Sequence, residues 1–413
     1  MDPSDASIGL RRVLREAMRQ QGPSQVMADR LARTFVPAVL VAAAGTFVVH
    51  NAISGWVPAL FNAMAVLLVA CPCALGFATP LAVWTGMRRL QALGLYVKHG
   101  DAVEKLAAVN RAVFDKTGTL SLPDVASELR MESDWADRRR EVEALVSAAE
   151  APVNHPVARV LAQMNPGGWG YSARSVAVEP GRGVSAEVQM SPDAVSRVRI
   201  SSDAGSPDSA SFSVDIDGAR AATILLRETK RQHVTELPAS LRTIGIDAVM
   251  MTGDRTERTV QFAFPSTYAS LRPEQKLDLV REWKVQGHCI VFVGDGINDA
   301  AAMAVSDVSI AVGREVGLPQ EVASIVWPEP AYDRLPKAIQ VCRDTVRVIR
   351  DNLRFALVYN VLGMAVAACG LLHPVLAVML MTVSSSVVTL RSLRLLDADE
   401  QSRALAGSHA AAS

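Results

Sequence analysis

Charged side chains are absent from two long stretches of this 413-residue chain. Residues 34–87 contain no Asp, Glu, Lys or Arg, and the same is true of residues 355–390. Each stretch could cross a bilayer twice, because one helical crossing needs roughly 20 residues. A helix buried in a soluble protein is the alternative, but uncharged runs of this length are typical of membrane spans. The sequence therefore predicts a multi-pass protein with the lipid bilayer as a partner.

An excess of one charge is also missing, since 42 Lys and Arg residues balance 42 Asp and Glu residues. This balance argues against a nucleic-acid partner. Cysteine is scarce, and two of the five cysteines lie inside an uncharged run, which argues against a secreted disulfide framework. Asp2, Asp5, Arg11 and Arg12 interrupt the N-terminus, so the first residues are not typical of a signal peptide.

Basic residues flank the uncharged stretches and predict their orientation. Arg33 and Arg88 bracket the first stretch, and Arg354 and Arg391 bracket the second. By the positive-inside rule, these ends lie in the cytoplasm. We therefore expect a cell-membrane protein whose central residues, 90–345, are cytoplasmic. The expected spans cover residues 34–53, 59–84, 353–370 and a final stretch that ends near residue 390.

Residues 113–120 carry the clearest signal for chemistry, because an apolar run ends there in Asp115 and a turn with Gly118 follows. A carboxylate at the end of a buried strand lies where open α/β sheets bind their ligands. It can attack the terminal phosphate of ATP, while nearby hydroxyls and turn amides hold the phosphate oxygens. An ordinary turn after a strand remains the alternative until other motifs are found.

Three further motifs supply that context. Residues 251–254 read Met-Thr-Gly-Asp, Lys276 ends the segment Arg-Pro-Glu-Gln-Lys, and residues 294–299 read Gly-Asp-Gly-Ile-Asn-Asp. Together with Asp-Lys-Thr-Gly-Thr at 115–119, they resemble the motifs of P-type ATPases, a branch of the haloacid dehalogenase superfamily. The resemblance implies a Rossmann-like, haloacid-dehalogenase-like phosphorylation domain that forms an aspartyl-phosphate.

The resemblance also implies a role for each motif. Asp115 would be the nucleophile, Lys276 would neutralise the phosphate, and Thr252 would contact the phosphoryl group. Mg²⁺ suits such a site because it prefers oxygen ligands. The implied catalytic residues are Asp115, Lys116, Thr117, Thr252, Gly253, Asp254 and Lys276, and the implied magnesium site comprises Asp115, Thr117, Asp295 and Asp299.

Residues 121–232 separate the first motif from the others and read differently. Helices are expected across 137–150 and 155–164, followed by alternating strands around a Ser-, Asp- and Gly-rich loop at 201–211. This pattern predicts an inserted α+β domain, which the resemblance implies binds ATP. The residues that match the family's nucleotide site are His155, Pro156, Gly181 and Gly183.

Cys71 and Cys73 flank Pro72 in the second expected span. Proline opens a helix, and two thiols beside freed carbonyls favour a soft ion such as copper(I) or zinc. Small cysteines packed at a kink are the alternative. Because Pro80 follows, the Cys-Pro-Cys arrangement resembles the heavy-metal branch of the P-type ATPases.

The last two expected spans resemble the copper branch of that group. Both lack the Lys and Asp that the zinc and cadmium branch would place there, and a methionine sulfur suits copper(I). Packing or interfacial anchoring is the alternative for each residue taken singly. The transported ion would be bound by Cys71, Cys73, Tyr359, Asn360, Met381 and Ser385.

The resemblance covers only the second half of a P-type ATPase. The N-terminal metal-binding domain has no counterpart here, and neither does the actuator domain, whose Thr-Gly-Glu loop positions the hydrolytic water. A fragment, a truncated product and one part of a split pump are the three interpretations. In a split pump, a separate chain would supply the actuator domain and the missing helices. We expect this chain alone to phosphorylate, to hydrolyse slowly and to move no copper.

The predicted fold class is a membrane α-helical part plus a cytoplasmic α/β part with an inserted α+β domain. The leading function is ATP-driven export of a heavy metal, copper(I), with ATP and Mg²⁺ as cofactors. A membrane-tethered haloacid-dehalogenase-type phosphatase and an inactive metal-binding remnant are the alternatives. The expected domains are a cytoplasmic amphipathic helix (1–33), a transmembrane hairpin (34–88), a phosphorylation domain (89–120 and 233–340), a nucleotide-binding domain (121–232), a second transmembrane hairpin (341–396) and a disordered tail (397–413).

Overall fold

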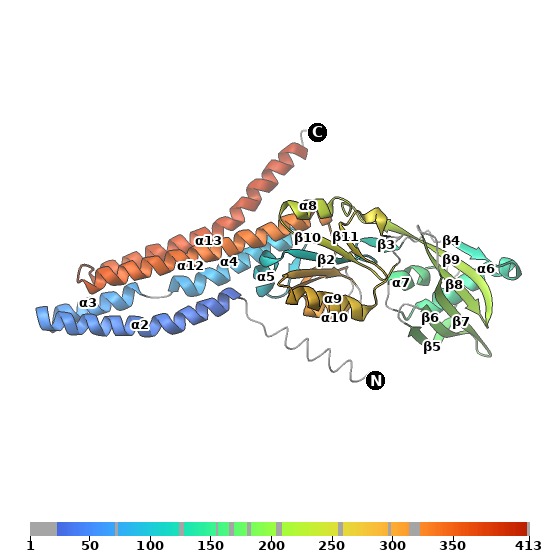
Figure 1. Ribbon diagram of the computed structural model, residues 1–413, viewed down its shortest axis with the longest axis horizontal. Helices are drawn as coiled ribbons and strands as arrows, with labels where there is room; N and C mark the ends of the chain where they lie inside the picture. The colour runs from blue at the N-terminus through green and yellow to red at the C-terminus, as the bar shows by residue number, and fades with distance from the viewer. Residues whose placement is uncertain are drawn as a thin grey trace. The chain divides into compact units, whose positions relative to one another are not determined.

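The protein divides into two compact units (Figure 1). The first contains residues 1–108, 324–326 and 334–413, and the second contains residues 109–323 and 327–333. The computed structural model describes residues 23–70, 73–123, 128–153, 156–164, 169–179, 183–203, 209–254, 259–295, 299–313 and 323–410.

Long helices build the first unit, as the uncharged stretches predict. Two helical segments among the described residues, Arg33–Ser54 and Pro374–Leu395, have the length and composition to cross a membrane. The apolar helix α3 (Trp56–Val69) is shorter. The other elements of this unit are α2 (Pro23–Ser54), α4 (Cys73–Ala92), β1 (Tyr96–Val97), α5 (Asp101–Ala108), β14 (Ile325–Trp327, which pairs with β1), α12 (Leu335–Ala368) and α13 (Pro374–Ala410).

Three predicted boundaries differ from the structure. Within the second predicted span, α3 ends at Val69 and α4 begins at Cys73, and residues 71–72 between them lie outside the described residues. The third predicted span is only the C-terminal part of α12, since no proline separates its basic first half from its apolar second half. The tail predicted to be disordered after residue 397 continues α13 as far as Ala410, because this segment is rich in Ala and lacks Pro.

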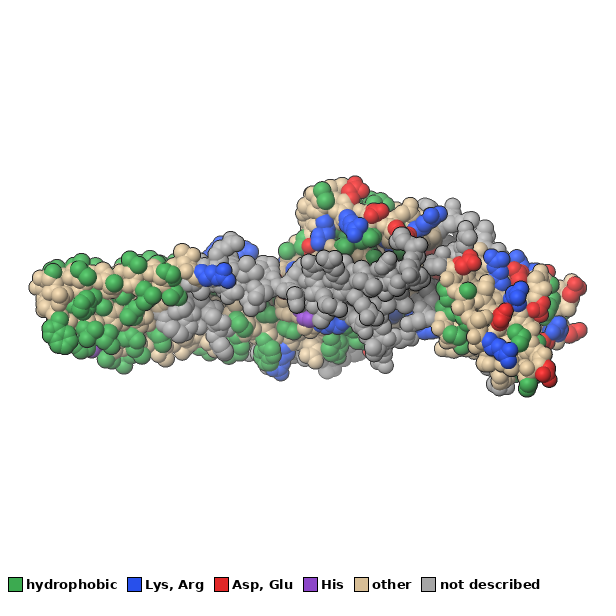
Figure 2. All heavy atoms as spheres, turned by 90° about the horizontal axis from the view of Figure 1, so that it is seen from below, with side chains coloured by type: hydrophobic (Ala, Val, Ile, Leu, Met, Phe, Trp, Pro, Cys, Tyr) green, Lys and Arg blue, Asp and Glu red, His purple; other side chains and the backbone are tan. Residues whose placement is uncertain are grey.

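Small and polar side chains set how the helices of this unit pack. A Cβ at Gly86 would lie 2.7 Å from Thr345 Oγ1, so α4 and α12 approach closely there. Asn352 Nδ2 donates a hydrogen bond of 3.0 Å to Ser392 Oγ, which joins α12 to α13. Hydrophobic side chains cover the outer faces of these helices in Figure 2, as suits contact with lipid.

A parallel sheet forms the first layer of the second unit. The five parallel strands in this unit follow the order β13-β12-β2-β10-β11, with β2 at their centre. The central strand is buried, as is typical where helices cover both faces; α8 lies on one face, and α9 and α10 lie on the other (Figure 1). The elements are β2 (Arg111–Asp115), α8 (Leu237–Thr243), β10 (Asp247–Met251), η3 (Val260–Phe262), β11 (Ser266–Tyr268), α9 (Pro273–Val285), β12 (Ile290–Gly294), α10 (Ala300–Val305), β13 (Val308–Val312) and η5 (Tyr332–Arg334).

An antiparallel sheet interrupts this parallel one in the sequence. Its strands follow the order β3-β9-β8-β7-β6-β5, and β4 also pairs with β9. Two helices, α6 and α7, share a hydrophobic core with it, which includes Leu145, Leu161 and Ile224. The elements are β3 (Ser121–Pro123), β4 (Glu128–Met131), η1 (Ser133–Arg138), α6 (Arg139–Glu150), α7 (Pro156–Ala162), β5 (Ser172–Glu179), β6 (Gly183–Ser191), β7 (Ala194–Asp203), β8 (Ser209–Ile216) and β9 (Ala219–Lys230).

The loop predicted at 201–211 is shorter than expected. Residues 201–203 belong to β7 and residues 209–211 belong to β8, because Ser201 pairs with Ser213 across the ladder and extends it beyond the polar composition. Otherwise the architecture confirms the predicted class: a helical part that carries a Rossmann-like α/β part with an inserted α+β domain.

Candidate active site

The register of the parallel sheet brings the predicted motifs to one edge. Asp115, the last residue of β2, lies opposite Met251, the last residue of β10. On the other side of β2, Phe114 lies opposite Val293 near the end of β12. Thr252 and Asp295 follow these neighbouring strands directly, so three loops converge at the carboxyl edge where such sheets bind ligands.

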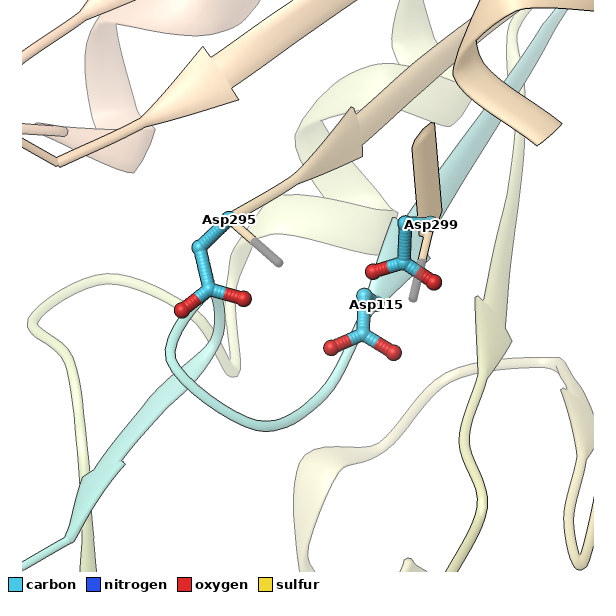
Figure 3. Close-up of side chains that lie close together, drawn as sticks. All are labelled: Asp115, Asp295 and Asp299. Atoms are coloured by element: carbon cyan, nitrogen blue, oxygen red, sulfur yellow. The ribbon is translucent and has the colours of Figure 1, made fainter. Parts of the chain in front are cut away.

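Three carboxylates meet at this edge, as Figure 3 shows. Asp115, Asp295 and Asp299 each place a carboxylate oxygen within 4.8 Å of the others. Lys276 reaches them from α9: its Nζ donates to Asp115 Oδ1 at 2.5 Å and to Asp299 Oδ1 at 2.8 Å. The structure thus brings together the predicted nucleophile, the predicted phosphate-neutralising lysine and the predicted magnesium carboxylates.

Burial and crowding of negative charge control the protonation of this cluster. Burial, together with the nearby Asp299, raises the pKa of Asp115 to about 6, although Lys276 opposes the rise. Burial also raises the pKa of Asp295, with Asp115 and Asp299 adding to the effect. Burial alone would lower the pKa of Lys276, but Asp115 and Asp299 outweigh it and hold that pKa above its ordinary value. Lys276 pairs with two of the three carboxylates, and the set of carboxylate oxygens fits a divalent cation with oxygen ligands.

Gly118 shapes the turn after the nucleophile. Its φ of +78° lies in the left-handed region, which side chains other than glycine rarely adopt. A Cβ at this position would lie 1.7 Å from Asp295 Oδ2, so the loop after β12 can approach the loop after β2 only because position 118 has no side chain.

The remaining predicted catalytic residues lie around this centre. Thr252 is buried, and its Oγ1 accepts a hydrogen bond of 3.0 Å from the backbone N–H of Asp254. The hydroxyl hydrogen of Thr252 can therefore be donated to another acceptor. Gly253 is exposed between them, and Thr117 is partly buried in the turn after β2.

The ammonium of Lys116, another predicted catalytic residue, is held by two carboxylates. Its side chain is fully buried, and its Nζ forms ion pairs with Glu228, at 2.5 Å, and with Asp254. Sequence reasoning missed Glu228, which lies in the segment that leads back from the inserted domain. The sequence signal for it was weak, since a single Glu in a strand that ends Arg-Glu-Thr-Lys-Arg looks like an ordinary solvated position.

The predicted nucleotide residues are only partly described. His155 and Gly181 lie outside the described residues, and Pro156 is the first residue of α7. The backbone requires glycine at position 183, because a Cβ there would lie 2.0 Å from the carbonyl oxygen of Ile200 in the neighbouring strand.

Sequence reasoning also missed Glu150, a carboxyl that ends α6 and is only 4% exposed; burial raises its pKa to about 7.

The predicted ligands of the transported ion lie on three helices that pack together, α4, α12 and α13. Cys71 lies outside the described residues, and Cys73 is the first residue of α4. On α12, Asn360 is buried, and the Tyr359 hydroxyl is buried without a hydrogen-bond partner among the described residues. The two predicted residues on α13, Met381 and Ser385, are both partly buried.

Comparison with known proteins agrees with this geometry. The family of haloacid dehalogenase-like hydrolases matches residues 109–307. A copper-exporting P-type ATPase from Mycobacterium tuberculosis is 34% identical in an alignment that covers 94% of this chain and 53% of the relative. A cation-transporting P-type ATPase B from Mycobacterium bovis is 32% identical, over 93% of this chain and 54% of the relative. A crystal structure of a zinc-transporting PIB-type ATPase in its E2.Pi state is 25% identical, with a TM-score of 0.65 over 94% of this chain and 66% of that chain.

The parallel sheet, the carboxylate cluster at its edge and the family match define a haloacid dehalogenase-like domain within residues 109–307. Over nearly its whole length, the chain is similar to P-type ATPases described as copper-exporting, cation-transporting or zinc-transporting. It spans about half the length of the curated relatives that it matches.

Proposed function

We propose that this chain performs the phosphoryl-transfer step of a heavy-metal P-type ATPase. A carboxylate oxygen of Asp115 attacks the γ-phosphorus of ATP and forms an aspartyl-phosphate. The bond from that phosphorus to the oxygen shared with the β-phosphate breaks, and ADP leaves with the electron pair. The observation that carries the proposal is the contact of Lys276 with both Asp115 and Asp299 at the carboxyl edge of the sheet.

Each neighbouring side chain has a part in this step. The Lys276 ammonium supplies positive charge beside the attacking carboxylate. Thr252 can donate its hydroxyl hydrogen to a phosphoryl oxygen, because its own oxygen already accepts from the backbone. Mg²⁺ would neutralise charge on the phosphate oxygens when bound. The residues that would hold it are Asp115, Thr117, Asp295 and Asp299.

The inserted domain would hold the adenosine part of ATP. This proposal rests on two sequence motifs, one that contains His155 and Pro156 and one that begins at Gly181. Gly183 contributes less to it, because strand pairing alone accounts for glycine at that position.

Copper(I) is the transported ion that we propose. The relatives do not decide the metal, since one is described as copper-exporting and a solved neighbour as zinc-transporting. The choice rests on soft ligands, Cys71, Cys73 and Met381, and on the buried Tyr359 hydroxyl, which has no hydrogen-bond partner among the described residues. Residues 355–390 contain no Lys or Asp that would favour a harder ion. For full turnover we propose that the chain works with an actuator domain and further helices.

Phosphorylation tests the first part of the proposal. The full chain in detergent, given radiolabelled ATP and Mg²⁺, should form an acid-stable, hydroxylamine-sensitive phosphoenzyme, and Asp115→Asn should abolish it. Asparagine keeps the size of the side chain but lacks the nucleophilic carboxylate. A small-molecule phosphatase would instead hydrolyse p-nitrophenyl phosphate and take no label from ATP, and an inactive remnant would do neither.

Metal binding tests the second part. The chain should bind copper(I) more tightly than zinc, and the double variant Cys71→Ser, Cys73→Ser should lose that binding, because a hydroxyl is a poor ligand for a soft ion. Competition with a chromogenic copper(I) chelator measures the affinity, and Cys369→Ser provides a matched control at an exposed cysteine just after α12. Undiminished copper(I) binding by the double variant would show that these cysteines only pack.

A further inference from the structure

A short segment that leaves the inserted domain forms several hydrogen bonds with the turn that follows the nucleophile. Glu228, near the end of β9, accepts from Lys116 Nζ at 2.5 Å and from Ser121 Oγ at 3.2 Å. Just beyond β9, Arg231 donates from Nη2 to the carbonyl of Gly118 at 3.1 Å and from its backbone N–H to the carbonyl of Leu120 at 2.9 Å. The turn after Asp115 is thus hydrogen-bonded at several points to residues 228–231, the returning segment.

Lys116 forms the ion pairs in this set of contacts. Its side chain is 0% exposed, so its ammonium has lost its water and depends on its protein partners. Those partners come from two places, Glu228 in the returning segment and Asp254 in the loop after β10. Lys116 also follows Asp115 directly in the chain, so its ion pairs link the returning segment and the loop after β10 next to the nucleophile.

Glu228 lies at the boundary between the two sheets. It pairs with Pro123 in the two-strand ladder of β3 and β9, through which the chain enters and leaves the inserted domain. A carboxylate at this place links the covalent connection of the inserted domain to the ammonium beside the nucleophile. By contrast, Glu187 lies on β6 and its carboxylate faces Arg197 on the neighbouring strand at 3.7 Å, far along the chain from this connection.

We propose that Glu228 is a positioning residue that couples the inserted domain to Asp115 through Lys116. This inference rests on the proposed phosphorylation of Asp115. It adds that an ion pair connects the inserted domain to the parallel-sheet part of the second unit. A donor such as ATP, which must be held by the inserted domain while its γ-phosphate meets Asp115, depends on that coupling. A small donor such as acetyl phosphate reaches Asp115 by itself and does not.

The test compares these two donors in the full chain. Glu228→Gln keeps the shape of the side chain and removes its charge, and it should slow phosphorylation by ATP about ten- to a hundredfold, the cost of imprecise positioning. Labelling by acetyl phosphate should stay within about twofold, as should the dissociation constant for ATP measured by calorimetry. Glu228→Asp, which restores the charge, should recover most of the rate with ATP. Glu187→Gln should match the unmodified chain with both donors.

Each other outcome overturns the inference. Equal losses with both donors would show that Glu228 only supports the local fold of the site. A wild-type rate with ATP would show that its charge is not used, and a rise in the ATP dissociation constant without a slower step would make it a binding residue. Failure of the unmodified chain to accept phosphate from either donor would overturn the proposed function and this inference together, so the two failures are distinguishable.

Discussion

At the scale of single residues, Gly118 is the position where one added methyl group should damage the site most. In Gly118→Ala, the new Cβ would lie 1.7 Å from Asp295 Oδ2, and the backbone would keep a φ of +78°. We expect phosphoenzyme formation to be lost and the free energy of unfolding to fall by about 1–3 kcal/mol. Acid-quench labelling and thermal unfolding measure the two effects.

Gly287→Ala is the matched control for this substitution. Gly287 also has a positive φ, +89°, but nothing lies within 4 Å of its Cβ position. This variant should lose only the strain of the left-handed backbone, about 1 kcal/mol, and should label normally. Normal labelling of Gly118→Ala as well would mean that the close approach to Asp295 does not exist in solution.

Glu150 predicts a pH dependence of stability. Burial raises its pKa from 4.5 to about 7 in the folded chain, so the folded state holds this proton more tightly than the unfolded state. The free energy of unfolding therefore falls as pH rises from about 4.5 through 7 and is then level, a loss of about 3 kcal/mol at 1.36 kcal/mol per pKa unit.

Glu150→Gln should remove that loss. The variant should be more stable than the unmodified chain at pH 8 and equally stable at pH 4.5, as measured by thermal unfolding. Glu143→Gln on the same helix, whose carboxylate lies 2.9 Å from Arg139, serves as the control and should change stability by less than about 1 kcal/mol at either pH. A Glu150→Gln variant with no advantage at pH 8 would contradict the buried, uncompensated carboxyl.

The sequence was sufficient to find residues whose positions follow from their own strands. Asp115 and Asp295 each follow a short apolar run, and parallel strands end at the same edge of a sheet, so their meeting could be predicted. Glu228 could not be found in this way, because its partner Lys116 lies 112 residues away and the contact exists only after the chain has folded. Gly183 shows the opposite case, a motif glycine for which strand pairing gives a sufficient reason.

At the scale of elements, two glycines inside helices should respond to alanine in opposite directions. In Gly86→Ala, the added Cβ meets Thr345 Oγ1 at 2.7 Å, and Thr345 is fully buried and cannot move aside freely. We expect α4 and α12 to separate and stability to fall by about 1–3 kcal/mol. Gly45 on α2 has nothing within 4 Å, so Gly45→Ala should gain about 0.5–1 kcal/mol from helix propensity.

Thermal unfolding in the same detergent measures both variants. Destabilisation by both substitutions would point to a general sensitivity of the helices rather than to the contact of α4 with α12.

The existence of these helices could be predicted from the uncharged runs. Their boundaries could not, because Ala-rich segments such as the end of α13 prolong a helix beyond the hydrophobic stretch.

At the scale of the whole molecule, charge segregation organises the chain into an apolar helical unit and a polar α/β unit. Among the described residues, length and composition identify two helices able to cross a membrane; α3 is shorter, and α12 begins with a basic half. The four spans remain a prediction. This division places the proposed metal ligands and the proposed phosphorylation site in different units.

The central claim is that Asp115 becomes covalently phosphorylated by ATP, and locating the phosphoryl group tests it most directly. The chain is incubated with ATP and Mg²⁺, quenched in acid and reduced with borohydride, which converts an aspartyl-phosphate to homoserine. Peptide mass spectrometry should then find homoserine at position 115 and nowhere else, and none in samples without ATP. Homoserine at another aspartate, or labelled enzyme in which Asp115 remains unmodified, would contradict the account.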